Sequence, residues 1–308
     1  MGDKGVFWLP DAMSTFAGEV DALFWFVFWT STVLFAAVVG AKLYFMFRYK
    51  RKDETSVPEP VYESKILEMA WIVVPTVLVL FVFLWGFDVY LRMNTAPPDS
   101  YQITVRGKQW AWEFEYAEGV TTFTEMVVPV GRPVKLTMSS SDVLHSFFIP
   151  AFRVKQDIVP NRYSSVWFEA TQTGEFQIFC TEYCGTTHSG MLAKVRVVSE
   201  EDFASWISEQ SQDLPPEQLG AQLFAQCTAC HAVDGTVKIG PALNGIFGTQ
   251  QKLSDGTSVL VDENFIRESI LNPAVKVAEG FQPIMPAGYS SMTPKQIDGL
   301  VAYIKSLK

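Results

Sequence analysis

The chain has 308 residues, of which 48% are hydrophobic and 19% are charged, and its formal net charge is −9. This length suits two modest domains plus a further segment. The charge is uneven, because residues 93–216 carry 9 basic and 15 acidic residues, whereas residues 217–308 carry 7 and 8. The acidic balance excludes nucleic acid as a natural partner and favours a basic protein.

Two apolar segments near the start of the chain predict a membrane hairpin. Ala22–Ala41 contains 20 residues without a charge, and Met69–Phe87 contains 19. About 20 apolar residues are needed to cross a bilayer as a helix. We therefore predict an N-terminal segment over residues 1–92 with transmembrane helices at about 21–47 and 67–91.

A cleaved signal peptide is the alternative for the first apolar segment. Signal peptides have a basic leader ahead of a shorter apolar core, but residues 1–21 contain one Lys and four acidic residues. Five basic residues lie between the two predicted helices, namely Arg48, Lys50, Arg51, Lys52 and Lys65. The positive-inside rule places that connection in the cytoplasm and residues 93–308 outside it.

After the second predicted helix the pattern changes to short alternating segments. They are β-branched or aromatic and bounded by turn residues: Tyr101–Arg106, Trp110–Tyr116, Pro133–Ser139, Ser165–Glu169, Glu175–Cys180 and Met191–Val198. Such segments predict a β-sandwich or small barrel, here assigned to residues 93–211. The last part, residues 199–211, has a helical pattern.

A linker and a helical domain follow. Residues 212–216 (QDLPP) predict a linker, because consecutive prolines end regular structure. In residues 217–308 the predicted helices are Glu217–Gln226, Asp262–Leu271 and Pro294–Leu307, the last with Thr293 as its N-cap.

The three histidines and four cysteines of the chain all fall into two clusters. The first comprises His145 and the string CTEYCGTTHSGM, which contributes Cys180, Cys184, His188 and Met191. Thiolates, imidazoles and a thioether are soft ligands that suit copper. Two thiolates on one short loop can bridge two metal ions, which explains why the cluster has a second cysteine.

Two other interpretations of this cluster remain open at this point. A Cys₂His₂ zinc site has the right cysteines and histidines but does not use Met191. A structural disulfide between Cys180 and Cys184 suits an oxidising compartment but leaves both histidines without a role.

The strings SDVLHSF, around His145, and CTEYCGTTHSGM resemble the dicopper (CuA) loops of cytochrome c oxidase subunit II, and GKQWAWEFEY resembles the aromatic stretch of that family. The resemblance runs from about Leu23 to Val198. It implies a cupredoxin-type Greek-key barrel carried on a two-helix transmembrane hairpin.

The resemblance also implies roles for individual residues. Metal ligands would be the side chains of His145, Cys180, Cys184, His188 and Met191. Glu182 would bind copper through its main-chain carbonyl, and its side chain would belong to a magnesium site shared with subunit I. Trp110 or Trp112 would be the aromatic stepping stone for electrons. Glu68 would lie at the mouth of a proton channel, although a charge in this position is otherwise an ordinary interfacial residue.

The second cluster is Cys227-Thr-Ala-Cys230-His231, the attachment signature of c-type haem. A redox-active CxxC is the alternative, but the βαβ pattern of thioredoxin-like proteins is missing. Residues 217–308 resemble a class I cytochrome c, in which the carbonyl of Pro241 would fix the proximal imidazole of His231. The distal ligand is expected to be Met285, with Met292 as the rival.

Together these features predict a multidomain membrane protein that acts as the electron-input subunit of a haem-copper terminal oxidase. Electrons would pass from an external donor through haem c to CuA and on to subunit I, where oxygen is reduced to water. Expected partners are subunit I, other oxidase subunits, a donor protein and membrane lipid. The expected location is the bacterial inner membrane, with both redox domains on the periplasmic side.

Two rival functions are a small subunit of a CuA-containing nitric oxide reductase and a membrane-tethered copper-binding or copper-delivery protein. The haem domain disfavours copper delivery, which needs no redox partner. The sequence of this chain does not separate oxygen from nitric oxide as the terminal acceptor.

Overall fold

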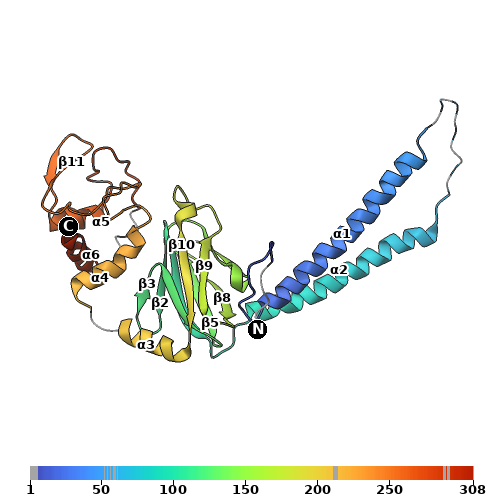
Figure 1. Ribbon diagram of the computed structural model, residues 1–308, viewed down its shortest axis with the longest axis horizontal. Helices are drawn as coiled ribbons and strands as arrows, with labels where there is room; N and C mark the ends of the chain where they lie inside the picture. The colour runs from blue at the N-terminus through green and yellow to red at the C-terminus, as the bar shows by residue number, and fades with distance from the viewer. Residues whose placement is uncertain are drawn as a thin grey trace.

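The computed structural model describes residues 6–51, 53, 55, 57, 60, 62–210, 214–286, 289 and 292–307. Figure 1 shows three parts in a row: a pair of long helices, a β-sandwich and a smaller helical part at the C-terminal end. The predicted linker lies partly outside the described residues, since 211–213 are not among them.

The two long helices are α1 (Ala17–Arg48) and α2 (Lys65–Asn94). Both are apolar on all sides and have mean hydropathies of 2.1 and 2.4, and no residue of either apolar window is buried. Each is long enough to cross a bilayer. Aromatic rings hold them together, since Phe26 lies 5.3 Å from Phe81 and 5.8 Å from Trp85 between ring centroids.

The β-domain consists of two five-stranded sheets and a flanking helix. One sheet has the order β3-β2-β1-β5-β8, and the other has the order β4-β10-β9-β6-β7. The pairs β1–β5 and β4–β10 are parallel, and the other paired strands are antiparallel. The strands are β1 (Tyr101–Lys108), β2 (Ala111–Tyr116), β3 (Thr121–Thr122), β4 (Glu125–Pro129), β5 (Pro133–Ser140), β6 (His145–Ile149), β7 (Val154–Ile158), β8 (Ser164–Glu169), β9 (Gly174–Cys180) and β10 (Leu192–Val198).

Alternating side chains fill the space between the sheets. In β5, every second residue is buried, beginning with Val134, as the period of two of a strand requires. Aromatic residues dominate the centre of this core, where Trp112, Phe114 and Phe147 are fully buried. Helix α3 (Glu200–Gln210) follows the last strand and places Phe203 against Tyr101, with ring centroids 5.2 Å apart.

The β-domain is fastened to the helix pair by side chains. The Arg153 guanidinium, whose side chain is 7% exposed, binds the Asp21 carboxylate of α1 with N–O distances of 2.7 and 2.8 Å. The indole N–H of Trp167 donates to the Arg92 carbonyl of α2 at 3.1 Å, and its ring packs edge-on against Phe16. These contacts fix the sandwich on the membrane-facing helices.

The C-terminal domain contains α4 (Pro216–Phe224), α5 (Glu263–Leu271), α6 (Pro294–Ser306) and one hairpin, β11 (Gln250–Lys252) with β12 (Ser258–Leu260). Its first and last helices cross at Gly220, where an added Cβ would lie 1.9 Å from the Gly299 carbonyl oxygen. Only glycine allows so close a crossing. The predicted N-cap of α6 is confirmed, because Thr293 and Gln296 form a reciprocal capping box.

The short helical elements given for the described residues are 3₁₀ turns. They are η1 (Pro150–Phe152), η2 (His188–Gly190) and η3 (Ala225–Cys227). The last two carry residues of the two predicted sites, so these turns are part of the functional geometry.

Candidate functional site

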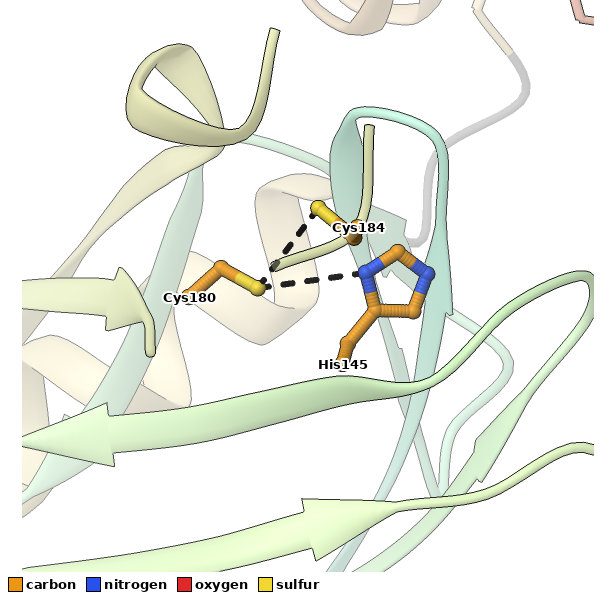
Figure 2. Close-up of side chains that lie close together, drawn as sticks. All are labelled: His145, Cys180 and Cys184. Carbon is orange, nitrogen blue, oxygen red and sulfur yellow. Dashed lines mark hydrogen bonds between the residues drawn. The ribbon is translucent and has the colours of Figure 1, made fainter. Parts of the chain in front are cut away.

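Five side chains gather at one end of the β-domain, and we call them the sulfur–imidazole cluster: His145, Cys180, Cys184, His188 and Met191. His145 begins β6 and Cys180 ends β9, and the pairing of these two strands brings the residues together. Figure 2 shows the Cys180 sulfur facing both the His145 ring and Cys184. All the predicted side-chain copper ligands therefore meet in one place.

The distances within the cluster are short. Cys180 Sγ lies 3.9 Å from His145 Nδ1 and 3.8 Å from Cys184 Sγ. Cys184 Sγ in turn lies 3.4 Å from His188 Nδ1 and 3.8 Å from Met191 Sδ. The two sulfurs are thus central, each with one imidazole beside it.

Electrostatics within the cluster favour a thiolate. The hydrogen bond with Cys184 lowers the pKa of Cys180 to about 3, against the effect of burial, and His145 assists. The same bond, together with burial, raises the pKa of Cys184. A metal cation would replace the shared proton, because thiolates are the metal-binding form of cysteine.

The donor set distinguishes between the interpretations left open by the sequence. Both cysteines are free, so the disulfide interpretation receives no support. The Met191 thioether is fully buried and contacts Cys184, whereas a zinc site of Cys₂His₂ type has no use for it. Two thiols, two imidazoles and a thioether form the soft set that copper prefers.

Asp142 orients His145. Its carboxylate Oδ1 accepts a hydrogen bond from His145 Nε2 at 2.8 Å, which leaves Nδ1 facing the sulfurs. Burial works against the charged imidazole, but the contacts with Asp142 and Cys180 together raise the pKa of His145. Histidine ligands commonly have such a carboxylate on their other ring nitrogen. No role for Asp142 was predicted from the sequence, although its position three residues before His145 could have indicated one.

The loop between the two cysteines is held by the turn that joins β1 to β2. The Gln109 side chain donates to the Cys184 carbonyl at 2.8 Å, and the Trp110 indole donates to the same oxygen at 3.3 Å. Trp112 lies on the other side of this turn and is fully buried, with its ring 6.1 Å from that of His145. Both predicted aromatic residues therefore adjoin the cluster.

Glu182 lies within the same loop. Its main-chain carbonyl is 3.3 Å from Cys180 Sγ, close to the cluster as the resemblance implies. Its side chain is partly exposed. Glu68 lies far along the chain, in the first turn of α2, and is exposed.

The C-terminal domain contains a cavity of about 180 Å³, which we call the C-terminal cavity. Its lining includes every predicted haem residue, namely Cys227, Cys230, His231, Pro241 and Met285. Met292, the rival distal ligand, is not among the described residues that line the cavity. The rest of the lining is mostly apolar, as a large flat porphyrin requires.

His231 is fixed by its neighbours. Its Nδ1 donates to the Pro241 carbonyl at 2.8 Å, so the other ring nitrogen is left as the free acceptor. Burial lowers the pKa of His231 and keeps the imidazole neutral, which is the metal-binding form. Gly240 allows this approach, since an added Cβ would lie 2.5 Å from the His231 ring.

The two sites adjoin. Gln109 and Trp110, which hold the Cys184 carbonyl, also line the C-terminal cavity. The same two side chains therefore contact the sulfur–imidazole cluster on one side and the cavity on the other.

Comparisons with known proteins match each part of the chain. Residues 3–89 match the transmembrane domain of cytochrome c oxidase subunit II, residues 120–198 match its periplasmic domain, and residues 217–308 match cytochrome c. The cytochrome c oxidase subunit 2 of Alkalihalophilus pseudofirmus is 30% identical over 298 residues, which cover 90% of this chain and 85% of that protein. The chain belongs to the cytochrome c oxidase subunit 2 family.

Two further proteins are similar to this chain. The cytochrome c oxidase subunit 2 of Bacillus sp. strain PS3 is 31% identical over 290 residues, which cover 85% of this chain and 80% of that protein. Among solved structures, the periplasmic domain of subunit II of cytochrome oxidase from Bradyrhizobium japonicum is 34% identical, with a TM-score of 0.37, and covers 38% of this chain and 96% of that chain.

Family membership confirms the coarser predictions. The chain is a membrane protein and the electron-input subunit of a haem-copper oxidase, and it works in a complex with subunit I. The fused cytochrome c domain and the periplasmic domain imply haem c and copper as its cofactors. The predicted combination of a helix pair, a β-sandwich and a helical C-terminal domain is also confirmed.

Proposed function

We propose that this subunit relays electrons from an external donor to haem c in the C-terminal domain, then to a dinuclear copper centre, and then to subunit I for reduction of oxygen to water. This order of electron transfer is supported by the position of Trp110 between the two sites. Trp110 lines the C-terminal cavity, and its indole N–H donates to the carbonyl of Cys184. Trp110 is then the route between the centres, and Trp112, which adjoins His145, supports the copper end.

The proposed copper ligands are the five side chains of the sulfur–imidazole cluster and the main-chain carbonyl of Glu182. When bound, the copper pair supplies a one-electron carrier that changes geometry little. Asp142 and Gln109 hold the ligands in place before and after electron transfer, and such a fixed ligand frame lowers the cost of reorganisation.

The proposed haem ligands are His231 and Met285, with Cys227 and Cys230 as the covalent attachment points. Burial raises the pKa of the Cys227 thiol, which lies in the wall of the C-terminal cavity. Ligation by His and Met gives a high potential, which suits an acceptor from a respiratory donor.

The remaining assignments complete the proposal. Residues 1–92 form the membrane segment, 93–211 the copper domain, 212–216 the linker and 217–308 the haem domain. Glu182 contributes its side chain to a magnesium site shared with subunit I, and Glu68 admits protons to subunit I. The complex lies in the bacterial inner membrane among its lipids, with the redox domains in the periplasm, and a donor protein meets the haem domain.

The decisive experiment removes one of the two thiolates that would hold the copper pair. In purified complex carrying Cys184→Ser, the donor should still reduce the haem, but no electron should reach subunit I and oxygen consumption should stop. Metal analysis of the unaltered complex should give copper. A zinc ion in place of copper, or normal oxygen consumption by the variant, would refute the relay.

A further inference from the structure

Lys108 is buried where the β-domain meets the C-terminal domain. It is the last residue of β1, and its side chain is only 8% exposed. Its ammonium lies 5.1 Å from the centre of the Phe123 ring in the β-domain and 5.3 Å from the centre of the Tyr289 ring in the C-terminal domain. One cation therefore contacts an aromatic ring of each domain.

The buried charge of Lys108 is compensated within the β-domain. Its Nζ lies 3.1 Å from Glu113 Oε2, and a second cation, Arg106, binds the other oxygen of the same carboxylate at 2.8 Å. Glu113 is thus not left alone if Lys108 loses its charge. Phe123 packs in the hydrophobic cluster of the C-terminal domain together with Tyr289, so both aromatic contacts of Lys108 lie where the two domains meet. A cation over a ring is most strongly held when water is excluded.

The position of Lys108 in the chain couples it to both sites. It directly precedes Gln109 and Trp110, the residues that hold the Cys184 carbonyl and line the C-terminal cavity. On the other side of the contact, Tyr289 is buried and also lines the cavity. Lys108 therefore links the turn that holds the Cys184 carbonyl to a tyrosine in the wall of the C-terminal cavity.

An independent contact lies on the same face. Thr187, the neighbour of His188, has a buried hydroxyl. It lies beside the thiol of Cys230, which packs against the core of the β-domain. The side of the C-terminal cavity that carries Cys230 thus faces the loop that carries His188.

We propose that Lys108 is a positioning residue: through Phe123 and Tyr289 it holds the C-terminal domain in the orientation that places Trp110 in the cavity wall and Cys230 beside Thr187. This inference rests on the proposed relay. A linker alone raises the effective concentration of the C-terminal domain without fixing its orientation. Electron transfer falls steeply with distance, so the orientation set by Lys108 determines the rate between the two centres.

The test is made in the complete oxidase with both centres loaded. The haem is reduced by a light flash, and the transfer of its electron to copper is followed. Lys108→Met keeps the length of the side chain but removes the cation, and we expect the docking equilibrium constant to fall about tenfold, the ordinary strength of a desolvated cation–π contact. The oxidation of haem by copper should then show an additional slow phase, whose rate is that of docking of the C-terminal domain onto the β-domain.

A second readout separates positioning from simple stabilisation. In Lys108→Met, an added soluble cytochrome c should reduce copper directly, because Trp110 is exposed whenever the C-terminal domain dissociates from the β-domain. Copper content, covalent haem content and haem reduction by the donor should stay unchanged. Lys108→Arg keeps the cation over both rings and should behave like the unaltered complex.

Matched variants complete the design. Arg132 also lies over a tyrosine ring and binds a glutamate, but within the β-domain, so Arg132→Met should leave the transfer rate unchanged. Tyr289→Leu should reproduce the slow phase and Tyr289→Phe should not. Combining Tyr289→Leu with Lys108→Met should add little, as expected for residues that act through one contact.

The outcomes are distinguishable. If the unaltered complex passes no electrons from haem to copper, the relay itself is wrong. If it does, and both Lys108→Met and Tyr289→Leu transfer electrons at the unaltered rate, the relay stands and the positioning role of Lys108 is refuted. Loss of copper from Lys108→Met would also refute it, since Lys108 would then support the β-domain alone.

Discussion

Replacing Asp142 by Asn should weaken copper binding, because no orientation of the amide satisfies the neighbours of the carboxylate. In the structure, Oδ1 accepts from His145 Nε2 at 2.8 Å and from the Val143 backbone N–H at 2.6 Å, while Oδ2 accepts from the Gln109 backbone N–H at 2.7 Å. An amide nitrogen at either position faces a backbone donor. If it faces His145, the imidazole must also move its proton to Nδ1, the nitrogen beside Cys180.

The magnitude follows from the bonds that are lost. A hydrogen bond to a charged group contributes about 1.5–3 kcal/mol, and a factor of ten in affinity corresponds to about 1.4 kcal/mol. Asp142→Asn should therefore lower copper affinity about 10–100-fold, the range found for such outer carboxylates. The measurement is the copper retained by the purified complex, per covalent haem, after dialysis against graded concentrations of a copper chelator.

Asp157→Asn is the matched control. Asp157 lies in β7 and accepts a hydrogen bond from Ser146, the neighbour of His145, at 2.6 Å, but it contacts no member of the sulfur–imidazole cluster in the described structure. The complex carrying Asp157→Asn should retain as much copper as the unaltered complex. Equal copper retention by Asp142→Asn and the unaltered complex would refute the role of Asp142, as would an equal loss from the control.

Three further predictions follow from the other sites. Met285→Ala should leave the haem covalently attached, lower its potential and allow carbon monoxide to bind; binding to Met292→Ala instead would show that Met292 is the distal ligand. Glu68→Gln should slow turnover while both metal centres are reduced normally, since protons are needed after the electrons arrive, and unchanged oxygen consumption would identify Glu68 as an ordinary interfacial charge. Gly240→Ala places a Cβ 2.5 Å from the His231 ring. Thermal unfolding should show that the C-terminal domain is destabilised by about 1–3 kcal/mol, a cost typical of overpacking. An unchanged melting temperature would mean that the ring can move aside.

The sites could be predicted from the sequence where their residues are close in the chain. Cys180, Cys184, His188 and Met191 belong to one loop, and the haem attachment residues belong to one pentapeptide, so spacing alone reveals the chemistry. The distant His145 was assigned to this cluster because the three histidines and four cysteines fall into two groups, whereas its actual approach depends on the pairing of β6 with β9, which residue spacing does not show.

Several strands could not be predicted from alternation. The strand β6 is buried at four of its five positions, and β4 at four of its five, so neither shows the polar and apolar alternation of a half-exposed strand. The strands with regular alternation, such as β5, were expected. Burial on both faces removed the signal in β4 and β6.

Contacts between elements that are distant in the chain also could not be predicted from the sequence. The contact of Lys108 with Tyr289 joins residues far apart in the chain, and nothing in the local pattern of either indicates it. From the sequence only a linker was predicted between the two domains, whereas the structure shows a direct contact between them, from Lys108 to Tyr289.

The attachment of the β-domain to α1 and α2 has a consequence for anyone who prepares the extracytoplasmic part as a soluble protein. A fragment that starts after the second helix loses Asp21, Phe16 and the Arg92 carbonyl together. Arg153, which is almost fully covered in the whole chain, would keep its left-handed backbone, with φ 57°, but lose its carboxylate partner, and Trp167 would present a bare indole face to water. Such fragments should associate through this face, and replacing Trp167 and Arg153 with smaller polar residues would be the remedy.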